Sequence, residues 1–172
     1  MAFNAKKWFI TCMITLFSVT ALLLVVFWIF DPYFHFHKPF PFVSYRLYDE
    51  RYINDGISMH FDYDLIITGT SMAQNFKTSE ADVLFGVKSV KETFSGAAYK
   101  EISENLERAL SRNKDLKTII WTMDTNAILR DKDYVAYDEY PVYLYDDNPW
   151  NDVNYVFNKE VCYHGVLNNL LM

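Results

Sequence analysis

Hydrophobic residues form one long, uninterrupted run near the start of the chain. Between residues 8 and 30 no side chain is charged, and neither Gly nor Pro occurs. At 1.5 Å per residue, a helix of this length can cross a hydrocarbon layer of about 30 Å. Trp8 and Trp28 stand near its two ends, and indole rings favour the membrane interface. The pattern predicts a transmembrane helix over residues 8–30.

The residues before this run predict its orientation. Lys6 and Lys7 are basic, and no acidic residue precedes Asp31. Because cytoplasmic flanks carry the excess of Lys and Arg, residues 1–7 are predicted to be a cytoplasmic tail, with everything after the run outside the cell membrane. A cleaved signal peptide is the alternative, but its apolar region usually spans only about 7–15 residues and ends at small residues. We therefore expect an uncleaved, single-pass anchor with the lipid bilayer as a partner.

A segment rich in Pro and aromatic residues follows the apolar run. Pro32, Pro39 and Pro41 oppose a regular helix, so residues 31–62 are predicted to be a juxtamembrane linker, extended in its first part. The sequence leaves two alternatives for its aromatic side chains: they lie against the lipid headgroups, or they cover the underside of the domain that follows. His35 and His37 have a spacing that a metal pair could use, but without Cys or carboxylate partners we expect no metal or cofactor.

From residue 63 the pattern changes to alternating strands and helices. Three short apolar segments, at residues 65–69, 87–94 and 118–123, are typical of buried parallel strands. A helix over residues 99–112 is predicted by apolar residues on one face. A shorter helix is predicted over residues 79–86.

The shorter helix has signals at both of its ends. Ser79 and Asp82 resemble a capping box at its start, and Gly86 is suited to its end. With this helix the order is β-α-β-α-β. Such units form a right-handed parallel sheet covered by helices, so we expect a partial flavodoxin-like α/β fold.

The remainder of the chain departs from this alternation. Residues 131–157 are acidic and rich in Tyr, which predicts a long loop. Asn148 followed by Pro149 predicts the start of a helix at about Trp150, with Gly165 as a possible interruption. Adjacent oxygen-bearing side chains at residues 146–148 could bind Ca²⁺, but without ligand spacing they are more typical of a solvated turn.

Composition and charge narrow the classes of partner. Aromatic residues make up 18% of the 172 residues, which is ample for a packed core. The part after the apolar run holds 14 basic and 22 acidic residues, a formal charge of −8. Because nucleic acid binding depends on Lys and Arg, we expect no nucleic acid partner. Cys12 lies in the apolar run and Cys162 is the other cysteine, so no disulfide is predicted within the outer part.

Candidate chemistry lies at the carboxyl ends of the predicted strands, where open α/β sheets bind ligands. Ser71 directly follows the first strand and precedes a helix. A serine there can be a nucleophile if a base takes its proton, although Thr70 and Ser71 could equally do no more than cap the helix. Gly96 follows the second strand and Asn126 the third, and both can supply hydrogen-bond donors to an oxyanion.

These segments resemble the SGNH (GDSL-like) superfamily of esterases and acyltransferases. Its first block, a strand followed by Gly-Asp-Ser, is similar to Gly69-Thr70-Ser71. Its second-block glycine corresponds to Gly96 in FSGAA, and Asn126 in TMDTNA is the closest match to its third-block asparagine. The resemblance implies that Ser71 is the nucleophile and that Gly96 and Asn126 form the oxyanion hole.

The resemblance covers roughly residues 64–160 and has two departures. Thr70 replaces the Asp of the first block, and Met-Asp-Thr-Asn replaces Gly-x-Asn-Asp in the third. The segments are most similar to membrane-anchored members from Gram-positive bacteria, of the DltD-like and polysaccharide O-acylation types. A cell-envelope polymer and a membrane acyltransferase are therefore the expected partners.

The family's last block, Asp-x-x-His, which supplies the base, has no match here. No Asp or Glu stands three residues before a His. His164 is the only candidate for the base, but Val161 occupies the carboxylate position before it, which is more typical of a surface or helix-end histidine. His60 precedes the first strand, so about five residues at 3.3 Å each, more than about 15 Å in all, would separate it from Ser71. This distance is too long for a hydrogen bond between the two side chains. Only three strands are predicted, so the third would be an uncovered apolar edge. We expect residues 63–172 to be an incomplete, truncated SGNH-like domain.

Two functions remain open from the sequence. One is a membrane-anchored esterase or O-acyltransferase of the cell envelope, with negligible turnover by this chain alone because an unactivated serine is a weak nucleophile. The other is a non-catalytic, membrane-tethered module that binds a partner or a glycan through residues 131–157, since aromatic faces suit both.

Overall fold

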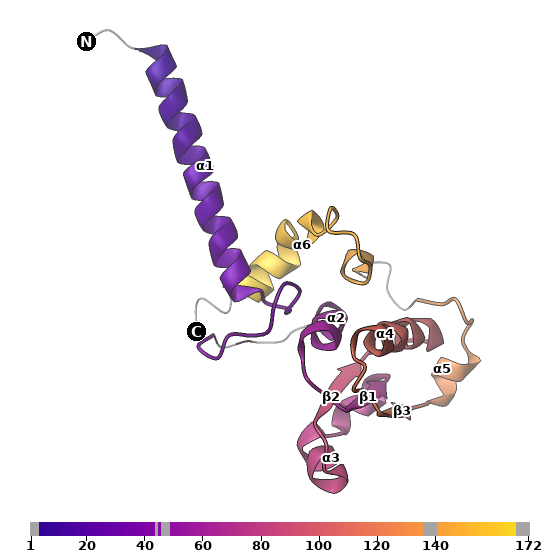
Figure 1. Cartoon of the computed structure of the whole chain (residues 1–172). Helices are drawn as coiled ribbons and strands as arrows, with labels where there is room; N and C mark the ends of the chain where they lie inside the picture. Colours follow the sequence, from indigo (N-terminus) through magenta and orange to yellow (C-terminus); the bar gives the residue numbers. More distant parts are fainter. Residues whose placement is uncertain (1–3, 44, 46–48, 136–140, 168–172) are drawn as a thin grey trace.

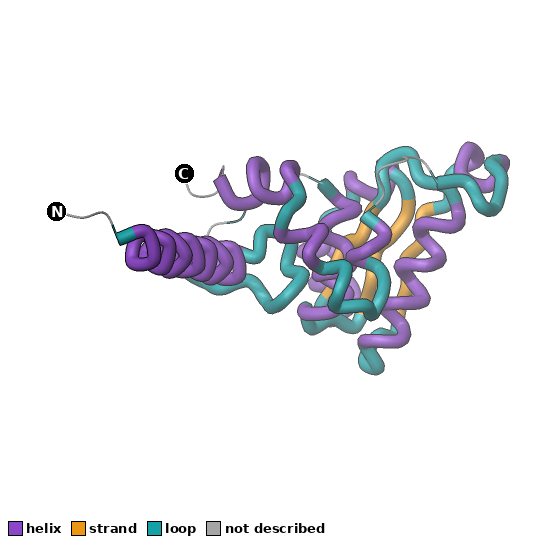
Figure 2. Tube along the Cα trace, turned by 90° about the horizontal axis from the view of Figure 1, so that it is seen from above, coloured by secondary structure: helices purple, strands orange, loops and turns teal. Residues whose placement is uncertain are grey.

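The chain begins with one long helix that extends away from the rest of the protein (Figures 1 and 2). The computed structural model describes residues 4–43, 45, 49–135 and 141–167. Helix α1 (Ala5–Phe30) starts at Asn4, whose side chain accepts a hydrogen bond from the Lys7 N–H at 3.1 Å. Phe27 is its only buried residue. Among the described helices, α1 alone is long and apolar enough to span a membrane, which confirms the predicted apolar helix.

Three parallel strands form the centre of the domain. They are β1 (Leu65–Gly69), β2 (Ser89–Thr93) and β3 (Thr118–Thr122), in the spatial order β2-β1-β3. Every residue of β1 is buried because it lies between the other two strands. The predicted α/β class and the three-stranded parallel sheet are confirmed.

Helices cover both faces of this sheet (Figure 2). On one face, α4 (Tyr99–Arg112) packs Ile102 and Leu106 against Ile66 of β1 and Phe94 after β2. The other face carries α3 (Thr78–Phe85), through Ala81 against Leu65 and Ile67. The bounds of α4 agree with the periodicity of its apolar residues. The result is a three-layer arrangement in which β3 remains partly exposed.

A helix that the sequence analysis missed lies within the segment assigned to the linker. Helix α2 (Glu50–His60) begins at Asp49, whose side chain accepts the Arg51 N–H at 2.9 Å, and it packs on α4 and β2. Its buried face is largely polar and includes Asn54 and Ser58. Hydrophobic periodicity therefore did not predict this helix. The sequence signal for its start was Asp49 as the N-cap, followed by an acidic residue in the first turn.

The predicted capping box of the short helix is wrong. Helix α3 begins one residue early, at Thr78, after Lys77, which makes no side-chain cap. The Asp82 carboxylate instead accepts the N–H of Ser89 at 2.6 Å, at the start of β2. The predicted end of this helix at Gly86 is confirmed. Gly86 caps the C-terminus of α3 with φ of 66° and donates its N–H to the carbonyl of Asp82.

A second core joins the end of α1 to the domain. Phe27 of α1 packs edge-on against Tyr155 with ring centroids 5.3 Å apart, in a cluster that also buries Tyr33, Ile53 of α2 and Leu144. This cluster is called the junction core below. The linker aromatics in it lie beneath the domain, which is one of the two positions left open by the sequence.

Buried Asp31 organises the turn at the start of this junction. Its carboxylate accepts the N–H groups of His35, Phe36 and His37 at 2.7–3.0 Å and the hydroxyl of Tyr155 at 3.0 Å. Burial raises the pKa of Asp31, and the hydrogen bonds from the backbone and from Tyr155 oppose that rise. Asp31 therefore fixes the direction in which the chain leaves α1.

The C-terminal part is built from short elements. They are α5 (Thr125–Leu129), η2 (Val142–Leu144), α6 (Val153–Val156) and η3 (Val161–Leu167). The helix predicted from Trp150 begins later, because the Asn148 side chain accepts the Trp150 N–H in a turn. The interruption falls at Asn158, which caps the next helix, and that helix continues through Gly165. The side chain of His164 lies outside the described residues.

Candidate functional site

The carboxyl ends of the three strands meet at one edge of the sheet. Gly69 of β1 is in register with Thr93 of β2 and with Thr122 of β3. The segments that follow these residues contain Ser71, Gly96 and Asn126. The structure therefore places all three predicted site residues on loops of the same edge, called the rim below.

Ser71 is exposed at the first position after the β1 turn. It begins η1 (Ser71–Asn75), a short 3-10 helix whose cap is Thr70. No hydrogen bond to the Ser71 side chain occurs among the described residues. The hydroxyl is accessible from solvent but has neither a base nor an orienting partner there, so nothing in the described part raises its nucleophilicity.

Thr70 joins the first loop of the rim to the third. Its hydroxyl donates to the carboxylate of Asp124, which also accepts the Ala127 N–H at 2.8 Å and so begins α5. These two hydrogen bonds, that of Thr70 first, hold the pKa of Asp124 below its usual value. Thr70 thus binds an Asp of the loop that follows β3.

A second link joins the β1 loop to the β2 loop. The Gln74 amide donates to the Ser95 hydroxyl at 2.8 Å and to Glu50, whose carboxylate also accepts the Ser95 N–H at 2.8 Å. Arg51 donates to the Ser95 carbonyl at 2.9 Å. Sequence reasoning missed these residues because Glu50 and Arg51 come from α2, far from the rim in sequence.

Gly96 and Asn126 occupy different environments on the rim. Gly96 has φ of 67°, and its carbonyl accepts a hydrogen bond from Arg130 at 2.6 Å. This contact fixes the peptide between Gly96 and Ala97. Asn126 lies exposed in the first turn of α5. The loop around Gly96 is therefore held on both sides, whereas the Asn126 side chain is open to solvent.

The described histidine side chains are engaged elsewhere. His35 Nε2 contacts Asp152 at 3.1 Å, and His37 contacts the carbonyls of Lys38 and Trp28. His60 ends α2 and contacts the carbonyl of His35 at 3.2 Å. His35 and His37 thus have separate partners, and the described residues contain no group of three or more His, Cys, Asp or Glu that could hold a metal.

The acidic turn at residues 146–148 is also internally bonded. Asp146 accepts the N–H of Asn148 at 2.8 Å and the Asn151 amide at 2.7 Å, and Asp147 pairs with Arg112. Its carboxylates therefore have partners from the protein, as in a structured solvated turn.

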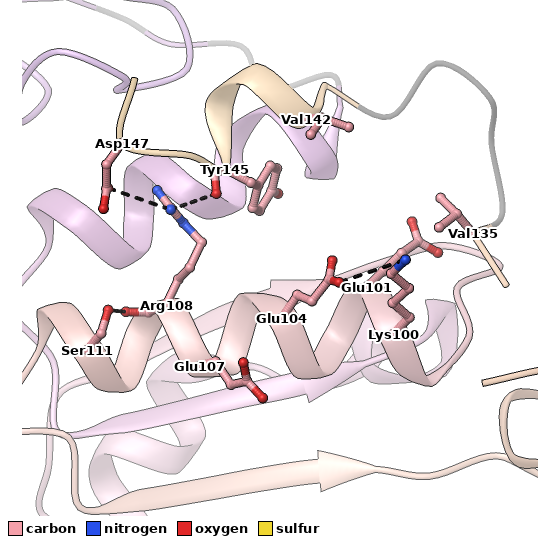
Figure 3. A pocket seen from close by; sticks show the side chains of 10 residues that line it. All are labelled: Lys100, Glu101, Glu104, Glu107, Arg108, Ser111, Val135, Val142, Tyr145 and Asp147. Carbon is pink, nitrogen blue, oxygen red and sulfur yellow. Dashed lines mark hydrogen bonds and ion pairs between the residues drawn. The ribbon is translucent and has the colours of Figure 1, made fainter. Parts of the chain in front are cut away.

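Separate from the rim, an open groove of about 720 Å³ runs along α4 (Figure 3). Lys100, Glu104 and Glu107 of α4 line one side, and Val142 and Tyr145 line the other. Ser71, Gly96 and Asn126 do not line this groove, whereas Val142 and Tyr145 belong to the segment 131–157 predicted to bind a partner.

Arg108 crosses from α4 to the C-terminal segment at one end of this groove (Figure 3). It donates to Asp55 at 2.7 Å and to the Tyr145 carbonyl at 2.6 Å. These contacts attach the C-terminal segment to α2 and α4.

A buried carboxyl lies inside the sheet layer. Glu92 of β2 is fully buried and accepts hydrogen bonds from Ser58 at 3.0 Å and from Asn105 at 2.5 Å. Burial raises the pKa of Glu92 to about 8, and these two hydrogen bonds oppose the rise. Its position in the middle of a strand, among polar residues of α2 and α4, was not predicted from the sequence.

Comparison of the chain with protein-family models, with curated proteins and with solved structures found no match.

Proposed function

We propose that the protein is a single-pass membrane protein whose α/β domain lies outside the cell, with residues 1–7 in the cytoplasm. Three features support this topology: the uncovered apolar surface of α1, its mean hydropathy of 2.5, and Lys6 and Lys7 before it. The strand order β2-β1-β3 agrees with the first three strands of a flavodoxin-like sheet.

We further propose that the domain is an SGNH-like esterase or O-acyltransferase domain acting on cell-envelope polymers. The observation that carries this proposal is the rim, where hydrogen bonds tie the β1 loop with Ser71 to the loops with Gly96 and Asn126. Ser71 is the nucleophile, and Gly96 and Asn126 are the oxyanion donors. Because the described residues bring no base to Ser71, this chain alone has negligible turnover.

An external base tests this reading directly. The full chain, purified in detergent, is incubated with p-nitrophenyl acetate, with and without imidazole. Imidazole would take the Ser71 proton as Oγ bonds the acyl carbon and the nitrophenolate leaves. We expect an acetyl group on Ser71, detected by peptide mass spectrometry, only when imidazole is present.

Two variants complete the design. Asn126→Ala should reduce the acetylation of Ser71, whereas Ser79→Ala, at an exposed serine of α3, should leave it unchanged. The proposal fails if Ser71 is acetylated no more than Ser79. Acetylation of Ser71 without imidazole, followed by turnover, would contradict the predicted inactivity.

A binding module without catalysis is the second candidate, and exposed aromatics favour it. The hydroxyls of Tyr143 and Tyr145 are bonded within the protein, to Asn158 and to the Arg51 carbonyl. Trp150 and Phe157 are instead 87% and 75% exposed, and both suit sugar rings or a protein partner.

Retention of an envelope polymer by the full chain in a pull-down tests this second function. Binding is expected to survive Ser71→Ala and to be lost in Trp150→Ala. The reverse pattern would assign the polymer to the rim instead.

A further inference from the structure

The chain turns back on α1 as soon as the helix ends. Asp31 and Phe34 have positive φ values, 30° and 62°, and together they reverse the chain direction. The His37 ring then lies 2.7 Å from the carbonyl of Trp28, in the last turn of α1. Residues 37–42 are consequently held against the end of the helix.

Four aromatic side chains gather at this point, and they are called the aromatic collar. The centroid of the Trp28 ring lies 4.9 Å from the centroid of the His37 ring and 6.3 Å from that of the Phe40 ring. Phe40 also contacts His37 at 4.5 Å and stacks on Phe42 at 5.2 Å, with an angle of 11° between the rings. The collar is therefore one continuous aromatic surface rather than four separate residues.

The domain leaves two of the four collar residues exposed and the other two partly buried. Phe42 is 75% exposed and Trp28 is 50% exposed, although both are large and apolar. Val25 and Leu24 are also exposed, and they lie three and four residues before Trp28, hence on the same face of α1. A surface that continues the apolar face of α1 is expected to meet the same surroundings as α1.

The height of the collar along α1 agrees with the edge of a bilayer. Trp8 and Trp28 are 20 residues apart, which corresponds to about 30 Å of helix, the thickness of the hydrocarbon layer. Next to the collar, Lys38 pairs at 2.5 Å with Asp62, which follows α2, and both side chains are exposed. The surroundings thus change from apolar rings to charged groups within a few residues, as they do in the headgroup layer.

We propose that the aromatic collar inserts into the outer headgroup layer of the lipid bilayer and seats the domain directly on the membrane. This inference rests on the proposed membrane span of α1. The partner is the lipid interface itself, and the junction core holds the collar and the domain in one orientation.

Depth measurements on the full chain test this proposal. Cys12 and Cys162 are replaced by Ser, a single cysteine is introduced at Phe42, and an environment-sensitive fluorophore is attached. The protein is placed in nanodiscs of phosphatidylcholine and phosphatidylglycerol. Quenching by brominated lipids is then compared with quenching by iodide in the water.

Two matched positions calibrate the result. Phe17, in the middle of α1, is 66% exposed, and Val83, on α3, is 84% exposed, so both accept a label without disturbing a core. A label at position 42 should be quenched by brominated lipid several-fold more than a label at position 83. It should also be quenched by iodide several-fold less.

The possible failures can be told apart. If the label at position 42 is quenched like the label at position 83, while the label at position 17 is quenched by brominated lipid, the collar proposal is overturned and the membrane span stands. If 17 is also quenched by iodide, the membrane span itself is wrong. Protection of 42 from both quenchers would show that protein covers the collar, for example a second copy of the chain, and this also overturns the proposal.

Discussion

Single residues determine the shape of the rim. At Gly69 the backbone has φ of 145°, and a Cβ atom there would lie 2.0 Å from the Thr122 hydroxyl. Only glycine fits this close approach between β1 and β3. Gly69 was recognised in the sequence as part of a motif, but the contact that requires it is a packing contact and cannot be read from the motif.

Glu92 is the residue whose ionisation should affect stability most. Its pKa in the folded protein, about 8, is above its usual value of 4.5. A carboxyl group with a raised pKa contributes its full stability below about pH 4.5, and this contribution is lost as the pH rises towards 8. The cause is the cost of burying its charged form.

Glu92→Gln should remove this pH dependence, because the amide keeps the size of the protonated carboxyl group without titrating. Urea unfolding of the detergent-solubilised chain at pH 5 and pH 8.5 measures it. We expect the unchanged protein to lose on the order of a few kcal/mol between these values, and the variant to lose much less. Glu107→Gln, at an exposed position of α4, is the matched control. An equal loss in all three proteins would refute the assignment to Glu92.

Among the elements, those with apolar faces were predicted well and those with polar buried faces were not. The bounds of α4 and the three strands were recovered to within about two residues, because α4 repeats its apolar residues with the helical period and the strands lie in short apolar segments. Helix α2 was missed because Arg51, Asn54 and Asp55 are buried in place of apolar residues. Their partners come from β2, α4 and the Ser95 loop, which a local pattern cannot show.

One hydroxyl group adds hydrogen bonds to the apolar link between α1 and the C-terminal segment. Tyr155 is fully buried, donates to Asp31 and accepts the N–H of Tyr33 at 3.1 Å. Tyr155→Phe removes both of these hydrogen bonds from the junction core, which should lower the free energy of unfolding by about 1–3 kcal/mol. Urea unfolding followed by fluorescence measures the change.

Tyr99→Phe is the control for this prediction, since it removes the same hydroxyl group from a half-exposed ring stacked on Trp121. Its unfolding free energy should stay within about 0.5 kcal/mol of the unchanged protein. Equal losses in the two variants would show that the Asp31 contact contributes nothing specific.

For the whole molecule, the sequence predicted the layers of the domain but not how α1 joins it. Residues 31–62 appeared to be a linker because Pro and aromatic residues carry no periodic signal. In the structure, Tyr33 and Phe34 pack with Leu144 and Tyr155, more than 100 residues away. The rim was predicted as a shared edge from strand order alone, whereas its links through Glu50 and Arg130 needed the fold.

The junction core has a mechanical consequence. Three side chains pack against both the junction core and the apolar cluster between the sheet and α4, namely Ile57, Phe61 and Tyr145. Packing is therefore continuous from α1 to the sheet. In the proposed membrane span, the apolar run at residues 8–30 covers about 35 Å, more than the hydrocarbon layer, and such helices tilt in the bilayer. Under that proposal a thinner or thicker bilayer would change the tilt, and α1 would turn the domain with it, changing the direction in which Ser71 faces.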